Sequence, residues 1–230
     1  GDSQLSAVQH NLLTALGLLQ SSISGVSDKA SGESGGAALK CLDAIRLFIN
    51  LAAEDEVCAE IVDCALGDLI VAMGKFLSDA LVQEKALKLI TNLASADDES
   101  IPDRMTRAGA VRAGISSLQS HPRAVPVQVK GLFALRNLAS STLTRQAILE
   151  EQGLVVLLNA LQRHPRSEQV QEQGILALYN LSFDEAALVE MRDRGQLPKL
   201  LQGATSRFEG NQAIQAYGTA TAKKIATPPT

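Results

Sequence analysis

Four asparagines recur along this sequence at an almost constant interval. Each closes a short apolar run and is followed by leucine, and successive copies lie 42, 45 and 43 residues apart. The four residues are Asn50, Asn92, Asn137 and Asn180. A primary amide offers both a hydrogen-bond donor and an acceptor, which suits the main chain of an extended peptide. The asparagines are therefore candidate peptide-binding residues; the alternative is that each amide only bonds the backbone of a neighbouring helix.

Basic residues accompany the first three asparagines. Residues four and seven positions before an asparagine share its face of a helix. Those positions hold Arg46, Lys85, Lys88 and Lys130, together with one aromatic residue, Phe133. Cations beside the amides favour an acidic or phosphorylated ligand segment. The alternative for the four cations is a solvated surface, and the alternative for Phe133 is packing between repeats.

The elements that position these residues are predicted to be long amphipathic helices. In the copy that ends at Asn180, apolar or small residues follow the i, i+4, i+7, i+8, i+11 pattern of a buried stripe. A small residue lies six positions before each asparagine, where we expect it to let a neighbouring helix come close; these residues are Ala44, Ala86, Gly131 and Gly174. In the last unit the same count places Ala216 at the small position and Ala222 at the asparagine position.

Other markers keep the same period. Glycines follow at intervals of 42, 44 and 42 residues, and we expect each to end a short helix in the left-handed conformation; they are Gly67, Gly109, Gly153 and Gly195. The polar turn after each asparagine predicts a helix start, and Ser182 with Glu185 has the spacing of a capping box. His-Pro-Arg loops at 121–123 and 164–166 should end the helix before each of them.

Markers that repeat every forty-odd residues in phase are typical of a helical repeat array. We therefore expect one all-α domain over residues 1–230, with about five units of which the first and last are atypical. The first unit is predicted to be incomplete, with a helix over 4–20, a Ser- and Gly-rich loop over 21–36 and a second helix over 37–52. The predicted units are 4–52, 53–94, 95–139, 140–182 and 183–226, with a frayed tail at 227–230.

This pattern resembles the armadillo repeat family. A repeat of that family has about 42 residues and three helices, and the asparagine lies in the third. The best copies of the third-helix motif are 131–138 and 174–181, which both read Gly-x-x-Ala-Leu-x-Asn-Leu, and the match covers nearly the whole chain. The resemblance implies a right-handed superhelical solenoid whose third helices line a concave groove, where each asparagine holds the main chain of an extended protein segment. Importin-α-like repeats also carry a tryptophan four residues before the asparagine. This chain has no tryptophan, which disfavours binding of a nuclear localisation signal.

Composition narrows the class of protein further. The chain is 46% hydrophobic, and its net charge of −4 gives no basic footprint for nucleic acid. Its three cysteines, Cys41, Cys58 and Cys64, have no metal-ligand spacing and are expected to be reduced, buried thiols of a cytoplasmic protein. No apolar run is long enough for a transmembrane helix. A membrane tether or targeting signal upstream of Gly1 is left open, and with it a peripheral membrane location.

No phosphate-binding loop, catalytic carboxylate pair or zinc motif is present in the sequence. We therefore expect no enzyme activity, cofactor or metal, and predict a protein-binding scaffold or adaptor. Two alternatives remain. Exchange factors of Hsp70-type chaperones use related short armadillo-like arrays to hold a folded domain, and a membrane-tethered or cytoskeletal scaffold could carry its anchor outside this sequence.

Overall fold

Residues 2–25 and 34–227 are described by the structure, which is a computed structural model. Every regular element among them is an α-helix, which confirms the predicted all-α class. The first two helices form a pair. The helices after them form successive triplets, each with two shorter helices followed by one of 14 or 15 residues.

The pair consists of α1 (Asp2–Ser24) and α2 (Ser34–Leu51). The triplets are α3 (Asp55–Cys64), α4 (Leu66–Lys75) and α5 (Ala80–Leu93); α6 (Ile101–Arg107), α7 (Ala110–Ser120) and α8 (Val125–Leu138); α9 (Thr142–Glu150), α10 (Gly153–Arg163) and α11 (Glu168–Leu181); and α12 (Glu185–Asp193), α13 (Leu197–Arg207) and α14 (Gln212–Ala226).

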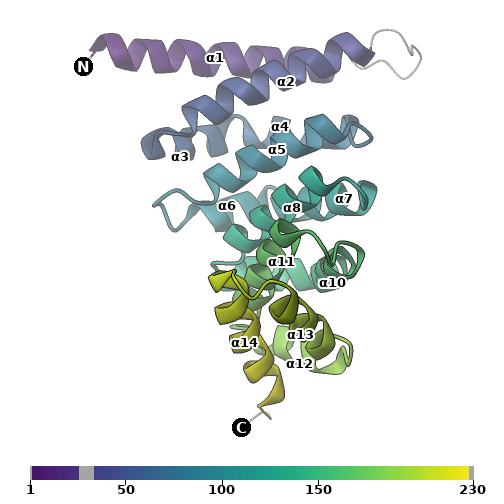
Figure 1. Cartoon of the computed structure of the whole chain (residues 1–230). Coiled ribbons are helices and arrows are strands. Elements are labelled where there is room, and N and C mark those ends of the chain that lie inside the picture. The colour runs from purple at the N-terminus through teal and green to yellow at the C-terminus, as the bar shows by residue number, and fades with distance from the viewer. Residues whose placement is uncertain (1, 26–33, 228–230) are drawn as a thin grey trace.

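The helices that close the pair and the triplets lie side by side along the molecule (Figure 1). We call α2, α5, α8, α11 and α14 the third helices, and each contacts the next in that order. The second helices α4, α7, α10 and α13 form a neighbouring row in the same way. Buried side chains from Leu12 to Ile225 form one continuous core, so each triplet is stabilised by the triplets beside it.

The boundaries of the first unit differ from those predicted. α1 continues to Ser24 and α2 begins at Ser34, so both ends of the predicted 21–36 loop are helical. The centre of that loop, 26–33, lies outside the described residues, as do residues 228–230 of the predicted tail. Serine and glycine have low intrinsic helix propensity, but contact between α1 and α2 stabilises the helical ends.

The predicted close approach at small residues is confirmed. A Cβ atom on Gly131 would lie 2.6 Å from the side chain of Leu118, and one on Gly174 would lie 2.7 Å from that of Leu161. Both leucines belong to the second helix of the same triplet. A side chain at either glycine would therefore force that leucine, or the helix that carries it, to move.

The register predicted for the last unit is wrong by two residues. Gly218, and not Ala216, packs against the second helix, with 3.0 Å between a Cβ built on Gly218 and the methyl carbon of Thr205. Ala216 is exposed. Six residues after Gly218 comes Lys224, which therefore takes the asparagine position in place of Ala222. This stretch of α14 is so rich in small residues that composition alone does not identify the buried one.

A glutamine ties the second helix to the third in every triplet. The Nε2 atom of Gln128 donates to the carbonyls of Leu118 (2.9 Å) and His121 (3.0 Å), which lie ten and seven residues earlier. Gln83, Gln171 and Gln215 make the same two bonds at the same offsets. The last carbonyls of a helix have no donor within it, and the glutamine supplies one.

The loops that join second to third helices are also linked from one triplet to the next. His121 Nε2 donates to the carbonyl of Leu77 at 2.7 Å, and His164 Nε2 donates to that of Pro122 at 2.8 Å. The acceptor in each case belongs to the equivalent loop of the preceding triplet. The two predicted His-Pro-Arg loops are thus confirmed as loops, and their imidazoles have a structural partner.

The glycine markers behave differently from the prediction. Only Gly109, with φ of 98°, adopts the left-handed conformation, whereas Gly67 lies inside α4 and Gly153 begins α10. Before Gly153 the left-handed residue is Gln152, with φ of 58°. Gly153 is needed for a different reason, because a Cβ there would lie 2.4 Å from the Ile148 side chain.

The predicted capping box at Ser182 and Glu185 is also wrong. The side chain of Asp184 caps α12 by accepting from the Ala187 N–H at 3.2 Å. Ser182 instead donates its hydroxyl to the Tyr179 carbonyl at 2.6 Å. An aspartate one helical position ahead of Glu185 is the stronger cap, because its carboxylate also opposes the positive end of the helix dipole.

Candidate peptide-binding face

The predicted site residues lie on four adjacent third helices. Arg46 and Asn50 lie on α2; Lys85, Lys88 and Asn92 on α5; Lys130, Phe133 and Asn137 on α8; and Asn180 on α11. Arg46, Asn50 and Lys88 are exposed, and the other six are half-buried. We call the surface made by these positions the third-helix face. No member is withdrawn into the core, so each retains surface for a ligand.

Two of the four asparagines link neighbouring third helices. Asn137 Nδ2 donates to the Thr91 carbonyl on α5 at 3.2 Å, and Asn180 Nδ2 donates to the Arg136 carbonyl on α8 at 2.8 Å. In both cases the acceptor is the residue just before the asparagine of the preceding helix. One amide N–H of each is therefore used in the fold, while the Oδ1 atom accepts from no described residue.

The other two asparagines make no such link. Asn50 is exposed and Asn92 is half-buried, and neither side chain is hydrogen-bonded to any residue that the structure describes. The structural alternative, in which the amide bonds the backbone of a neighbouring helix, thus applies to two of the four asparagines. Asn137 and Asn180 have a structural role. In Asn50 and Asn92 the donor and the acceptor of the side-chain amide both remain available to a ligand.

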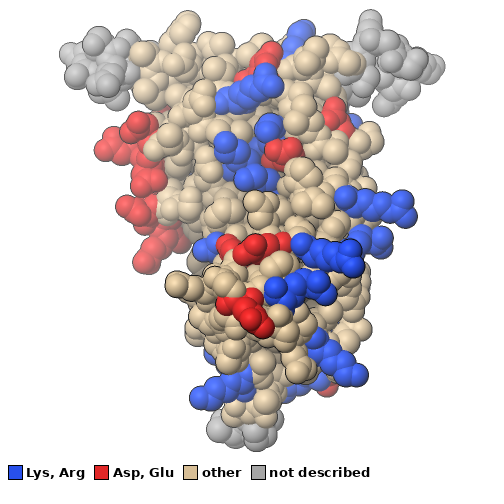
Figure 2. Space-filling view, in the orientation of Figure 1, with Lys and Arg blue, Asp and Glu red and all other residues tan. Residues whose placement is uncertain are grey.

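The basic residues of the face are partly neutralised. Arg46 pairs with Asp43 at 3.3 Å on α2, and Lys85 pairs with Glu84 at 2.8 Å on α5. Lys88 and Lys130 have no ion-pair partner within the described part of the chain. Figure 2 shows Lys and Arg side chains gathered over α2 and α5, with a few carboxylates among them. Among the cations of this face, those without an ion-pair partner among the described residues therefore lie on α5 and α8.

The face changes character at α11. The equivalents of Lys130 and Phe133 there are Gln173 and Leu176, which are only 8% and 7% exposed. Arg136 covers this region by donating to the Gln173 side chain at 3.0 Å, and its guanidinium also lies 4.9 Å from the Phe133 ring centre. The Phe133 ring therefore packs against the Arg136 guanidinium of its own helix while remaining half-buried.

Four residues that were not predicted as site residues come together where the end of α11 meets α14. The rings of Tyr179 and Tyr217 lie 4.8 Å apart, and those of Tyr179 and Phe183 lie 5.1 Å apart, both edge to face. The Lys224 ammonium lies 3.4 Å from the Phe183 ring centre and donates to the Ser182 carbonyl at 3.3 Å. We call Tyr179, Phe183, Tyr217 and Lys224 the aromatic–lysine cluster.

The cluster is exposed in part and desolvated in part. Phe183 is 58% exposed and Tyr217 is 37% exposed. Partial burial lowers the pKa of Lys224, because the charged form loses water there. The correct register of α14 would have revealed that Tyr217 and Lys224 share the third-helix face, since Gln215 and Gly218 repeat the spacing of Gln171 and Gly174.

A second charged surface follows the turns between third and first helices. Its six exposed carboxylates are Glu54, Asp55 and Glu56 at the start of α3, and Asp97, Asp98 and Glu99 before α6. Figure 2 shows this acidic edge on the left, where Figure 1 places α3 and α6. None of these carboxylates lies on a third helix, so the edge is separate from the predicted site.

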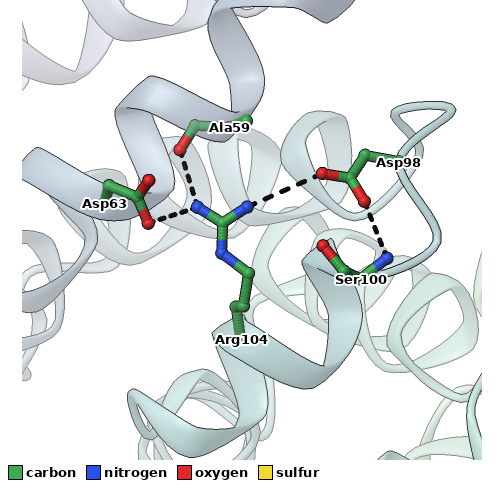
Figure 3. Close-up of polar contacts among 5 residues, drawn as sticks. All are labelled: Ala59, Asp63, Asp98, Ser100 and Arg104. Atoms are coloured by element: carbon green, nitrogen blue, oxygen red, sulfur yellow. Dashed lines mark hydrogen bonds and ion pairs between the residues drawn. The ribbon is translucent and has the colours of Figure 1, made fainter.

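Arg104 organises the acidic edge. It bonds Asp63 and the Ala59 carbonyl on α3 and lies 3.6 Å from Asp98 ahead of its own helix, α6 (Figure 3). Hydrogen bonds from Ser100, helped by the Arg104 charge, lower the pKa of Asp98 below its usual value. The arginine therefore links two successive triplets at this edge and pairs with one of its six carboxylates, Asp98.

Two cavities lie between neighbouring second helices. One of about 340 Å³ lies between α7 and α10 and has polar side chains from Gln119, Gln152, Asn159 and Arg163. Another of about 330 Å³ lies between α4 and α7 and is mostly apolar. Neither includes any residue of the third-helix face.

The cysteines follow the prediction in two cases of three. Cys41 and Cys58 are buried, and burial raises the pKa of the Cys41 thiol to about 11. Cys64 is exposed at the end of α3, so the expectation of a buried thiol is wrong there. The described residues contain no group of metal-ligating side chains, and none of their helices is long and apolar enough to cross a membrane.

Comparison with known proteins supports the fold alone. No protein-family model and no curated protein sequence matches the chain. A crystal structure of an engineered protein from the Northeast Structural Genomics Consortium is similar, with a TM-score of 0.69 and 24% sequence identity. The match covers 97% of this chain and 90% of that one. The whole stack of helices therefore has a solved counterpart.

Proposed function

We propose that this protein is a non-enzymatic scaffold or adaptor of the armadillo type, which binds an extended acidic segment of another protein along the third-helix face. The observation that carries the proposal is the group of Lys85, Lys88 and Lys130 beside Asn92 on α5 and α8. Lys88 and Lys130 lack ion-pair partners within the described residues, and the Asn92 amide is free of internal bonds there.

Both parts of this group suit an extended acidic chain. The amide recognises main-chain groups whatever the ligand sequence, and the ammonium groups select carboxylate or phosphate side chains. Adjacent packed helices lie roughly 8–10 Å apart, and an extended chain advances about 3.3 Å per residue. A ligand crossing from α5 to α8 therefore presents about three residues to these cations.

The test measures binding of a fluorescein-labelled peptide of alternating Glu and Ser by fluorescence anisotropy. The K85E/K88E/K130E variant is expected to lose at least tenfold in affinity, and binding by the wild type should weaken as salt rises. The matched control, R107E/R163E/K199E, changes net charge equally but on first and second helices, where the three residues are exposed. It should retain most of the affinity. Equal losses in both variants would show that only net charge matters and would refute the proposal.

A further inference from the structure

Binding to the third-helix face does not account for the aromatic–lysine cluster, which lies at the opposite end of the row from α2. The chain has only five Phe and two Tyr, yet both tyrosines and one phenylalanine meet there. Aromatic side chains dominate the energetics of protein interfaces, and here Phe183 and Tyr217 present much of their surface to solvent. Such a concentration needs an explanation beyond packing.

The cluster continues the third-helix face. Tyr217 lies seven residues before Lys224, as Lys130 lies seven before Asn137, and both pairs are set by a buried glycine six residues before the second member. Tyr217 therefore takes the position of Lys130, and Lys224 takes the position of Asn137. A ligand that follows the face from α5 and α8 across α11 arrives at these two side chains on α14.

We propose that the aromatic–lysine cluster is the apolar anchor site of the same ligand, and that it takes a large apolar side chain next to a carboxylate. The edge-to-face contacts of Tyr179 hold Phe183 and Tyr217 in place before the ligand arrives. The Lys224 ammonium group has three N–H donors, and one of them bonds the Ser182 carbonyl. The others are available to the carboxylate.

The region between the two sites sets the ligand's pattern. Glu168 and Glu172 lie on α11 beside the face positions, and Asn211 Nδ2 donates to both carboxylates, at 2.8 and 2.7 Å. The Arg136 guanidinium from α8 is bonded to Gln173, which itself donates to Glu172, so the two carboxylates outnumber the cation here and the ligand should be neutral. Two helix steps of roughly 8–10 Å at about 3.3 Å per residue place the anchor about five or six residues from the acidic part. The predicted ligand is therefore acidic, then neutral, then apolar with one acid.

This inference rests on the proposed function, and the test separates the two. Fluorescein-labelled peptides would carry four glutamates, a five-residue Gly-Ser spacer and either Phe-Glu or Ala-Glu, each made in both chain directions. In at least one direction the Phe peptide should bind the wild type about tenfold more tightly than the Ala peptide. The F183S/Y217A variant should lose this advantage while binding the Ala peptide as the wild type does.

The matched control is V71S/L143S, which removes exposed apolar side chains from α4 and α9. It should retain the advantage of the Phe peptide. Equal binding of Phe and Ala peptides in both directions, or an advantage that survives in F183S/Y217A, would overturn the anchor site and leave the proposed function standing. If neither peptide binds the wild type, both proposals fail.

Discussion

The inner third helices α8 and α11 differ from the end helices α2 and α14 in what their shared positions do. In α8 and α11 the asparagine donates to the preceding helix, and the glutamine nine residues before it is buried. In α2 those positions hold the exposed Asn50 and the thiol of Cys41, and in α14 they hold Lys224 and the half-buried Gln215. The asparagine position thus links neighbouring helices in α8 and α11, whereas the two ends of the row place the exposed Asn50 and the half-buried Lys224 there.

The largest expected effect is on the inner helix contacts. Gly131→Val should destabilise the protein by about 3 kcal/mol, because the new side chain would overlap Leu118. Gly203→Ala is the control, since a Cβ there meets no atom within 4 Å and alanine favours the exposed helix by about 0.5–1 kcal/mol. Urea unfolding of both variants measures the difference. Similar stabilities would mean that the tight contact is absent.

The glutamine ties come next. Gln128→Ala should cost about 2 kcal/mol, because two carbonyls at the end of α7 lose their donor in a buried place. Gln215→Ala removes the equivalent bonds near the surface, where water can replace them, and should cost less than about 1 kcal/mol. Denaturant midpoints at equal m-value compare the two. A larger loss at Gln215 would reverse the distinction between inner and end helices.

The asparagines should divide by whether their amides bond a neighbouring helix, with smaller effects. Asn137→Ala removes an interhelical bond and should cost about 1 kcal/mol. Asn92→Ala breaks no bond to a described residue, so its free energy of unfolding should match the wild type within about 0.5 kcal/mol. Asn92→Ala is consequently the variant in which reduced binding of the acidic peptide reports a lost contact rather than a damaged fold.

The smallest effect concerns the acidic edge, where the charges are exposed. The Asp98 carboxyl is expected to titrate below its usual range, because Ser100 and Arg104 stabilise its ionised form. Its contribution to stability is present above the unfolded-state pKa, and it is lost as pH falls through the lower folded-state pKa. Carboxyl ¹³C NMR titration should show the Asp98 pKa rising towards its usual value in Ser100→Ala. An unchanged titration curve would remove the Ser100 hydroxyl as a cause, since the variant keeps the backbone N–H that also bonds Asp98.

Much of the inner architecture was predictable from the sequence because its constraints act on residue type. Gly131 and Gly174 must be small to let two helices touch, so the period of small residues reports packing directly. The same logic predicted the His-Pro-Arg loops, since proline cannot continue a helix. Local steric rules of this kind leave a signal that one sequence carries by itself.

The missed features depend on partners that are distant in the chain. A glutamine near a helix start resembles a solvent-facing residue until its acceptors, seven and ten residues earlier, are known to lie beneath it. The register of α14 failed because lysine replaces asparagine and several small residues compete for one buried position. The aromatic–lysine cluster joins α11 to α14 and could not be recognised before that register was known.

The hydrogen bonds that link one helix or loop to another join residues with a limited separation along the chain. The amide links, the glutamine bonds and the histidine contacts all end within the same triplet or the one before it, and the longest of them spans 46 residues. Insertion or deletion of one complete inner triplet would thus leave each remaining bond of these three kinds with an equivalent partner. Evolution can in this way alter the distance between the lysines of α5 and the aromatic rings of α14, and so the length of segment recognised, without redesigning either end.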